Sequence, residues 1–529
     1  MKTIKKILPL IMLLLFVAFY YSCDEEDLNI SNPNNVAEPE FFQTENDFRL
    51  AVNGMYHPIT AVLFWGRVIH TGAMLRSDAY NVIPFQQNTT MSTLEGQPGI
   101  SRWAVDLYPQ LYQSIARANK IIEEDASNNV LSGDVQNEIL GQAHFQRAFC
   151  NWYLLNLFGT APLVMKTPDP QNPEEFFPSN ATPAMFNDAI IADLTEAINR
   201  LPQSWGENDI GRPTRGSALA LRGKTYLYLE NWTNAIADFT EVTTLGYSLL
   251  PSDNYGDNFS SNPTLENNSE SVYELQYVAQ DNFVWGADAP LTGSQSNWHI
   301  DYSPPHVSLD QGHVINPHIL QVFEDNGDVI RRNRTIAFDY PGATGYGGAP
   351  FTEDFAPSIE VAQNLGVPAL FSRKYAGLDE GLSSAEIPGF GHTLGTNWRI
   401  IRYADVLLML AEALNENGAT PDAIPFINQV RERAQISLLP NTLSKEEVEQ
   451  AIIDERIMEL TGEGHRFFDL VRWELADDIL GPGSTVAGGR HPKSLAGPAA
   501  VFTTGQDELL WIPLSEIQAN PNLNQNDGY

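Results

Sequence analysis

The chain has 529 residues, of which 43% are hydrophobic and 10% aromatic, and its formal net charge at pH 7 is −35. This composition excludes an intrinsically disordered chain and is typical of a globular protein. Strong negative charge repels phosphate backbones, so we predict that the protein does not bind nucleic acid.

Residues 1–22 have the pattern of a bacterial lipoprotein signal peptide. Three lysines precede an apolar stretch over residues 7–21, which is shorter than the roughly 18 apolar residues of a membrane-spanning helix. The small residue Ser22 then precedes Cys23, which we predict to be acylated, although Tyr20 stands where such signals prefer leucine. An uncleaved anchor and an ordinary secretory signal are the alternatives.

The segment after this leader, residues 23–40, is polar and begins with an acidic run, so we interpret it as a flexible tether. Removal of residues 1–22 deletes three lysines and no acid, which takes the formal net charge from −35 to −38. With Cys23 bound to lipid, Cys150 has no disulfide partner. Cys150 lies in an apolar helical pattern and is predicted to be a buried, small hydrophobic residue.

Helical periodicity begins in residues 41–245. Apolar residues recur at helical spacing over 106–125, and a longer helix is predicted over 135–158 that pairs with it. Thr182 and Pro183 predict the cap and first residue of a further helix.

Two later helix pairs share the spacing of small and aromatic residues found in tetratricopeptide repeats. Small residues at these places let antiparallel helices interlock, and stacked units bury a continuous face. The two registers begin at Gly223 and Ala411 and continue with Tyr226, Ala235, Phe239 and Val242, and with Leu414, Ala423, Ile427 and Val430. We therefore predict a mainly α fold built on a tetratricopeptide-like helical scaffold.

Residues 246–400 are rich in Gly, Pro, Asn and aromatic residues and are predicted to be a loop-rich region. Alternation over 272–278 predicts a strand. The stretches 294–305 and 340–350 are predicted to be ordered loops, and loops of this length in a compact protein are usually functional.

Residues 401–529 return to helix. Ser444 and Glu447 form a capping box. The predicted helical segment that follows carries acids and bases on one face, and we interpret most of them as structural ion pairs: Glu455, Arg456, Glu459, Glu463, Arg466, Asp469 and Arg472.

Motifs for catalysis are missing from the sequence. Gly223 is followed by Lys224 and Thr225, as at the end of a phosphate-binding loop, but Ala218 holds the place of the required glycine. Four histidines at positions 299, 306, 313 and 318 do not have the spacing of a compact metal site. We predict neither an enzyme nor a bound metal or cofactor. A carboxylate pair for glycoside cleavage stays an open alternative, because the chain has 66 acidic residues.

Several segments, in order along nearly the whole chain, resemble the SusD/RagB family of nutrient-uptake outer-membrane lipoproteins of Bacteroidetes. They are residues 23–30, 143–159, 397–413, 454–473, 510–516 and 520–526. The resemblance implies a surface-exposed, lipid-anchored protein of the outer membrane, whose helical scaffold supports an irregular ligand-binding half. It further implies capture of oligosaccharide and its delivery to a SusC-like TonB-dependent transporter. A peptide-binding member of the family and a surface glycosidase are the alternatives.

The expected organisation is a signal peptide over 1–22, a tether over 23–40, an N-terminal helical region over 41–245, a loop-rich region over 246–400, and a C-terminal helical region over 401–529. The last three regions are expected to pack as one body.

Candidate ligand contacts are aromatic residues beside polar ones, because sugar rings stack on aromatic planes and their hydroxyls need hydrogen-bond partners. Four other tryptophans lie in helical patterns or in segments that resemble the core of the family, and they are assigned to packing: Trp152, Trp232, Trp398 and Trp473. The predicted ligand residues are Trp65, Arg76, Asp78, Arg102, Trp103, Trp285, Asn297, Trp298 and Tyr302.

Mass spectrometry of the membrane-extracted protein should find Cys23 at the mature N-terminus, carrying acyl chains. Acylation with more than one chain gives stable membrane attachment. An unmodified Cys23, or a mature chain that starts elsewhere, would contradict the lipoprotein prediction.

Overall fold

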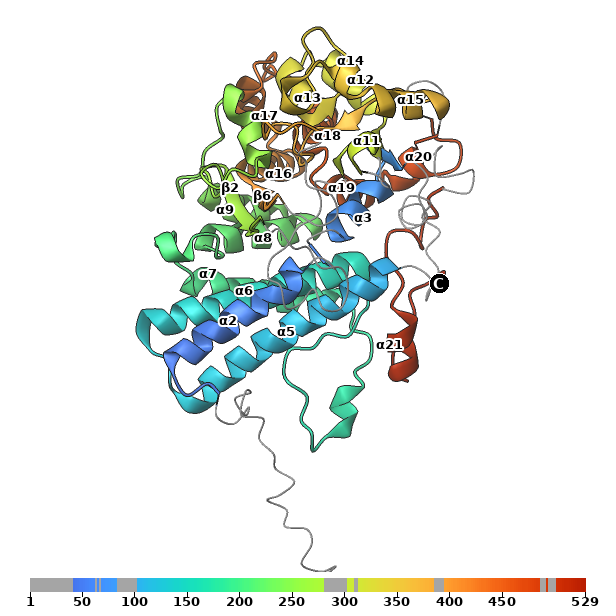
Figure 1. The fold of residues 1–529 in the computed structure, drawn as a ribbon. Coiled ribbons are helices and arrows are strands. Elements are labelled where there is room, and N and C mark those ends of the chain that lie inside the picture. Colours follow the sequence, from blue (N-terminus) through green and yellow to red (C-terminus); the bar gives the residue numbers. More distant parts are fainter. Residues whose placement is uncertain are drawn as a thin grey trace, which may run out of the picture.

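The computed structural model describes residues 41–61, 64–65, 68–82, 102–279, 302–308, 313–384, 394–485, 491–492 and 501–529. Helices dominate these ranges, and the strands are short, which confirms the predicted fold class. Figure 1 shows long helices α2, α5, α6 and α7 in a lower layer, a middle layer with α8, α9 and α16, and short helices α12 to α15 at the top.

The lower layer contains α2 (Glu45–Thr60), α5 (Arg102–Asn128), α6 (Gly133–Phe158) and α7 (Pro183–Arg200). The predicted pairing of the helices now labelled α5 and α6 is confirmed, and α7 packs on the other side of α6. The predicted cap of α7 is also confirmed, since the Thr182 hydroxyl accepts a hydrogen bond from the backbone N–H of Met185.

Two helical hairpins carry the repeat spacing. The first joins α8 (Arg215–Tyr228) to α9 (Trp232–Val242). A Cβ atom added at Gly223 would lie 2.7 Å from the Phe239 ring, so the two helices touch where the spacing predicts and only glycine fits there.

The second hairpin joins α16 (Tyr403–Glu416) to α17 (Thr420–Arg433), and Ala411 is buried together with Ala423 and Ile427 between them. α16 also packs against α9 and α18 (Lys445–Leu460), which begins at the predicted Ser444 capping box.

Residues 246–400 are more regular than the sequence predicts. They include α12 (Pro317–Asp325), α13 (Val329–Thr335) and α15 (Ala356–Asn364), and the shorter α11 (Pro305–Ser308) and α14 (Phe351–Asp354). Helices this short bury few residues and leave little periodicity in the sequence.

Two small antiparallel sheets were only partly expected. In the first, β2 (Ser271–Leu275), which begins one residue before the predicted strand and ends three residues before its end, pairs with β6 (Trp398–Arg402). The second has the order β1-β3-β5-β4 and joins residues far apart in the chain, from β1 (Tyr80–Val82), β3 (His313–Ile315), β5 (Phe371–Ser372) and β4 (Ile336–Ala337).

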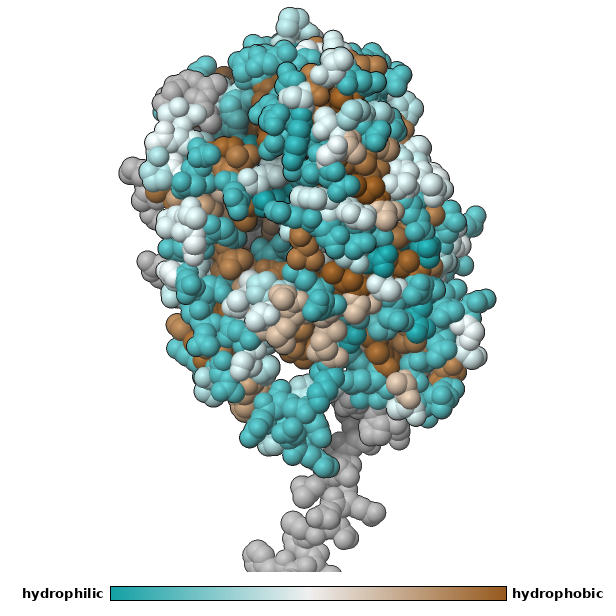
Figure 2. Space-filling model, turned by 180° about the vertical axis from the view of Figure 1, so that it is seen from behind, coloured by the Kyte–Doolittle hydropathy of each residue, from teal (hydrophilic) through white to brown (hydrophobic). Residues whose placement is uncertain are grey.

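One large hydrophobic core draws on all three regions of the chain, from Ile59 to Leu523. Cys150 lies within it, and burial raises the pKa of its thiol to about 12, which confirms its predicted role as a buried hydrophobic residue. The surface seen in Figure 2 is mostly hydrophilic, with hydrophobic residues scattered over it.

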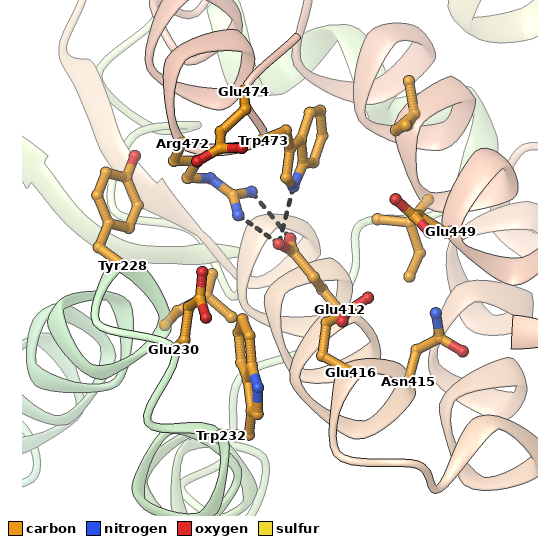
Figure 3. Close-up of a pocket in the computed structure, with 13 residues that line it drawn as sticks. Tyr228, Glu230, Trp232, Glu412, Asn415, Glu416, Glu449, Arg472, Trp473 and Glu474 are labelled. Atoms are coloured by element: carbon orange, nitrogen blue, oxygen red, sulfur yellow. Dashed lines mark hydrogen bonds and ion pairs between the residues drawn. The ribbon is translucent and has the colours of Figure 1, made fainter. Parts of the chain in front are cut away.

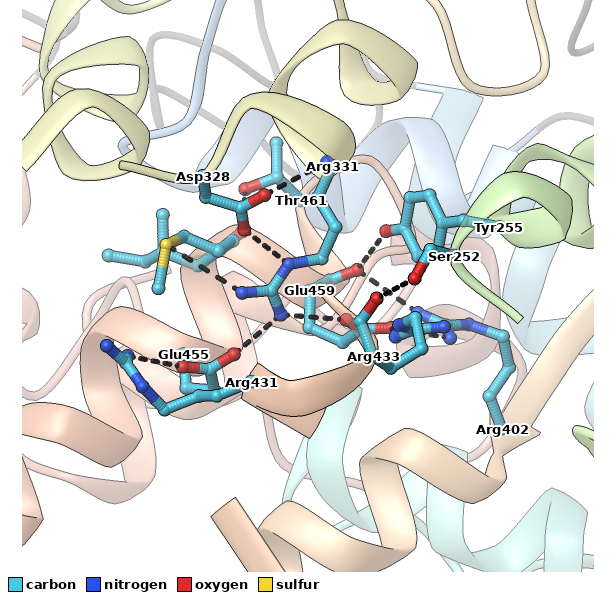
Figure 4. A network of polar contacts seen from close by, with 12 residues as sticks. Ser252, Tyr255, Asp328, Arg331, Arg402, Arg431, Arg433, Glu455, Glu459 and Thr461 are labelled. Atoms are coloured by element: carbon cyan, nitrogen blue, oxygen red, sulfur yellow. Dashed lines mark hydrogen bonds and ion pairs between the residues drawn. The ribbon is translucent and has the colours of Figure 1, made fainter. Parts of the chain in front are cut away.

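A network of buried ion pairs joins the upper and middle parts of the fold (Figure 4). The Glu459 carboxylate of α18 is fully buried and accepts hydrogen bonds at 2.9, 2.8 and 2.6 Å from Arg331, Arg402 and Arg433. Burial alone would raise the pKa of Glu459, but the three arginines more than offset it and hold this pKa well below its ordinary value.

The other acids and bases predicted on this face are also paired, which confirms their structural role. Their partners, however, come mostly from distant segments: Arg331 and Arg431 for Glu455, Asp405 for Arg456, Lys374 and Arg402 for Glu463, Asp78 for Arg466, and Glu412 for Arg472.

Replacement of Glu459 by Gln should lower the free energy of unfolding at neutral pH by about 3–5 kcal/mol, because it removes the one buried carboxylate that three buried arginines share. Since the folded-state pKa is depressed, the contribution of Glu459 is complete above its ordinary pKa of 4.5 and is lost as the pH falls toward the folded-state value. Urea denaturation across this pH range measures both effects. Glu432→Gln, at an exposed position of α17, is the control and should change stability little.

Candidate functional site

Four of the predicted ligand residues lie in the interior, so the prediction that they contact a ligand is wrong for this structure. Trp65 is 4% exposed, and its ring packs against Phe149 and Tyr153 with centroids 5.7 and 5.0 Å apart. An indole buried in this way has no free face for a sugar ring. The sequence around Trp65 does not show that this residue is buried. The residues that cover its ring lie on α6, far away along the chain.

Arg76 and Asp78 fix the end of α3 (Val68–Arg76) to distant segments. The guanidinium of Arg76 donates to the backbone carbonyl of Asp507. The Asp78 carboxylate accepts from Arg466 at 2.8 Å and contacts the His318 ring nitrogen at 2.9 Å. Burial would raise the pKa of Asp78, but Arg466 and His318 hold it well below its usual range. Both side chains therefore have internal partners.

Tyr302 is fully buried in an aromatic group that we call the anchor cluster: Tyr80, Tyr302, Tyr375 and Trp398. The ring of Tyr302 lies 6.5 Å from that of Tyr80 and 6.2 Å from that of Trp398, centroid to centroid. Its hydroxyl donates to the carbonyl of Gly462 at 2.9 Å. Tyr302 thus packs inside the protein and is not available to a ligand.

Two members of the anchor cluster also lie close, along the chain, to segments that contain or precede other predicted ligand residues. Tyr80 precedes residues 83–101, and Tyr302 directly follows residues 280–301. A Cβ atom at Gly395 would lie 2.2 Å from the backbone nitrogen of Ala279, so the chain that leads into residues 280–301 touches the segment just before Trp398 of the anchor cluster. One end of residues 83–101 and one end of residues 280–301 therefore lie close together, at Tyr80 and Tyr302.

Arg102 and Trp103 form the first turn of α5, and their side chains lie outside the described part of the structure. Ala104 and Leu107, just beyond them, are buried, and α5 packs against α3 there. Trp285, Asn297 and Trp298 lie outside the described residues, and their role stays a prediction.

Trp152 and Trp398 are buried, as their assignment to packing predicts, but Trp232 and Trp473 are only half-buried. These two rings line a pocket of about 330 Å³, which we call the Trp232–Trp473 pocket (Figure 3). Glu412 lies at its centre and accepts from Arg472 and, at 2.9 Å, from the indole N–H of Trp473. Helical spacing alone did not distinguish a pocket wall from a core position.

The predicted ordered loop over residues 340–350 lines two adjoining cavities of about 550 and 680 Å³. Both are lined by Tyr340, which is half-buried, and Thr344. The nearby Arg334 and Arg373 both pair with the same carboxylate, that of Asp379.

Within the described residues, no group of three or more His, Cys, Asp or Glu side chains is arranged to hold a metal ion. The helices found in the same ranges are either too short or too polar to cross a bilayer.

Comparison with known proteins gives consistent matches along the chain. A family model described as "SusD family" matches residues 385–529, and one described as "Starch-binding associating with outer membrane" matches residues 70–227. A SusD-like protein from Formosa agariphila is 28% identical over 97% of this chain and 98% of its own.

Solved structures match over similar lengths. A SusD superfamily protein from Bacteroides vulgatus ATCC 8482 has a TM-score of 0.76 and 26% identity, over 92% of this chain and 100% of its own. A laminarin-binding SusD-like protein has a TM-score of 0.68 and 24% identity, over 92% of this chain and 99% of its own. At that identity, the second likeness shows the fold alone.

Replacement of Trp65 by Ala should lower the free energy of unfolding by about 3–5 kcal/mol, because it leaves a cavity among buried rings. Chemical denaturation measures this loss. Phe176→Ala, which removes a ring that is 51% exposed, is the control and should change stability by less than about 0.5 kcal/mol. Equal, small effects of both substitutions would contradict the packing role of Trp65.

Proposed function

The chain belongs to the SusD/RagB family, and from this premise we propose that it is a surface glycan-binding lipoprotein that captures oligosaccharide and delivers it to a SusC-like TonB-dependent transporter. The description of one family model as starch-binding and outer-membrane-associated supports the ligand class and the location. The laminarin-binding protein of the same fold supports glycan as the ligand. In this proposal the protein binds its ligand and does not cleave it.

The observation that carries the proposal is the convergence of chain segments at the anchor cluster. Residues 83–101 and 280–301 start or end beside Tyr80 and Tyr302, whose rings are 6.5 Å apart. Trp285, Asn297 and Trp298 belong to the second segment, and the first leads directly into Arg102 and Trp103. Aromatic planes with nearby polar side chains suit the apolar faces and the hydroxyl groups of sugars. The ligand residues proposed here are therefore those five.

The order of segments along the chain suits attachment of the protein to the membrane and delivery of oligosaccharide to the transporter. Acylated Cys23 would hold the protein to the outer membrane, and the 23–40 tether would let the helical body cover and uncover the transporter. The body begins with the α2 capping box, in which the Thr44 hydroxyl accepts from the Asp47 backbone N–H.

Replacement of Trp103 by Ala should weaken glycan binding by about 1–3 kcal/mol, the typical cost of losing an aromatic ligand contact. Isothermal titration calorimetry against a panel of polysaccharides and peptides measures this effect and identifies the ligand. Phe176→Ala, an exposed aromatic substitution outside the proposed site, should leave affinity unchanged.

Three results would contradict the proposal. If the Trp103→Ala variant bound glycan with wild-type affinity, the assignment of Trp103 to the binding site would be wrong. Binding of peptides, and of no glycan in the panel, would favour the peptide-binding alternative. Release of reducing ends during the titration would favour a glycosidase.

A further inference from the structure

The Trp232–Trp473 pocket carries more negative charge than its own cations neutralise. Five glutamates line it, and Arg472 is the single cationic residue among the lining residues described. Arg472 pairs with Glu412, and Lys445, outside the pocket, pairs with Glu416 at 2.8 Å. The other three glutamates, all exposed, have no ion-pair or hydrogen-bond partner for their carboxylates among the described residues: Glu230, Glu449 and Glu474. The pocket therefore has unpaired acceptors at its rim.

Most hydrogen-bond donors of the pocket are already in use. The Trp473 indole N–H and the Arg472 guanidinium both donate to Glu412, and Arg472 also donates to Asp469 at 2.9 Å. The Asn415 amide donates to the carbonyl of Lys445 at 3.1 Å. The side-chain donors that remain are the second amide N–H of Asn415, the Tyr228 hydroxyl and the Trp232 indole N–H. What the pocket offers an incoming group is thus mainly carboxylate acceptors.

The aromatic walls also suit a cation. The Arg472 guanidinium lies 4.6 Å from the Trp473 ring centroid and 5.4 Å from that of Tyr228, so these rings already hold one cation of the protein. Trp232 faces the pocket from the start of α9 (Figure 3). Tryptophan faces attract ammonium and guanidinium groups electrostatically.

The backbone at the rim is unusual. Helices α8 and α19 (Arg466–Arg472) each end in a turn whose left-handed residue is a glutamate, Glu230 at φ 55° and Glu474 at φ 57°. Gly418 and Gly327 hold the equivalent position after α16 and α12, as is usual for this turn. A side chain in this conformation is disfavoured, as it also is at Gln435 after α17, so glycine can replace either glutamate without backbone strain.

We propose that the Trp232–Trp473 pocket binds a lysine or arginine side chain of a protein partner, held between the aromatic walls and paired with Glu230, Glu449 and Glu474. Such side chains have only donors and carry positive charge, which matches a pocket of acceptors and negative charge. A volume of about 330 Å³ is large enough for one long side chain. This interaction is separate from glycan capture at the anchor cluster and does not depend on it.

An amino sugar is the alternative cation, but the pocket suits it less well. Sugar hydroxyls need donors as well as acceptors around the ring, and most pocket donors are already used. The pocket also lies between the two helical hairpins, among α8, α9, α16, α18 and α19, and stacked helical repeats present surfaces of this kind to protein partners.

Fluorine NMR of the protein labelled with fluorotryptophan tests the proposal, with the Trp232 and Trp473 signals assigned by Trp→Phe variants. The probes are short glycine peptides with a central lysine, arginine or glutamine. The lysine and arginine peptides should shift both signals in a saturable way that weakens with added salt, and the glutamine peptide should not.

The variant Glu230→Gly/Glu474→Gly should weaken peptide binding by roughly three- to tenfold, because it removes two partly exposed ion pairs. Its thermal midpoint should not fall, since glycine suits the left-handed backbone. Gln435→Gly is the matched control, because Gln435 has the same conformation at the end of α17, at φ 59°, and lies away from the pocket. It should leave binding unchanged. Glu230→Gln/Glu474→Gln removes the charge alone and should weaken binding similarly.

The proposal is overturned if neither basic peptide shifts the two signals, or if both double variants bind the peptides as the wild type does. It is also overturned if glucosamine shifts the signals at lower concentration than the peptides, which would make the pocket a sugar site. None of these results depends on the glycan titration of Trp103→Ala.

Discussion

Pairing of the buried Glu459 carboxylate with three arginines is the interaction on which the arrangement of the chain depends. The arginines come from α13, β6 and α17, so one side chain of α18 joins the upper region to the helical hairpins. Separation of these elements would leave buried charges unpaired, which is far more costly than losing a surface ion pair. Lys374 extends the network by donating to the carbonyl of Glu459 at 2.8 Å. Its neighbour Tyr375 belongs to the anchor cluster, and the network thereby fixes the part of the molecule where the proposed glycan-binding segments meet.

The helical scaffold could be predicted from the sequence because the residues that determine each helix and hairpin lie close together in the chain. The register from Gly223 places a small residue where Phe239 must approach, and the structure has that contact. Capping residues such as Thr182 and Ser444 mark helix starts in the same way. Strands such as β4 and β5 have two residues each, which is too short for any alternation to be recognised.

The site was less predictable, because exposure is decided by contacts between distant residues. Arg76 and Asp78 look like binding residues in sequence, yet their partners lie several hundred positions away. Trp473 looks like a core residue, yet it lines a pocket whose other walls come from both hairpins and from α18. In both cases the neighbours along the chain do not show which distant residues pack against the side chain.

The central claim is that glycan is bound where the segments beside the anchor cluster meet. The structure of a complex with the tightest-binding oligosaccharide tests it most directly. The account predicts a sugar ring stacked on Trp103, with Trp285 or Trp298 in contact with the same ligand. A sugar bound instead in the cavities beside Tyr340 or in the Trp232–Trp473 pocket, with Trp103 free, would contradict it.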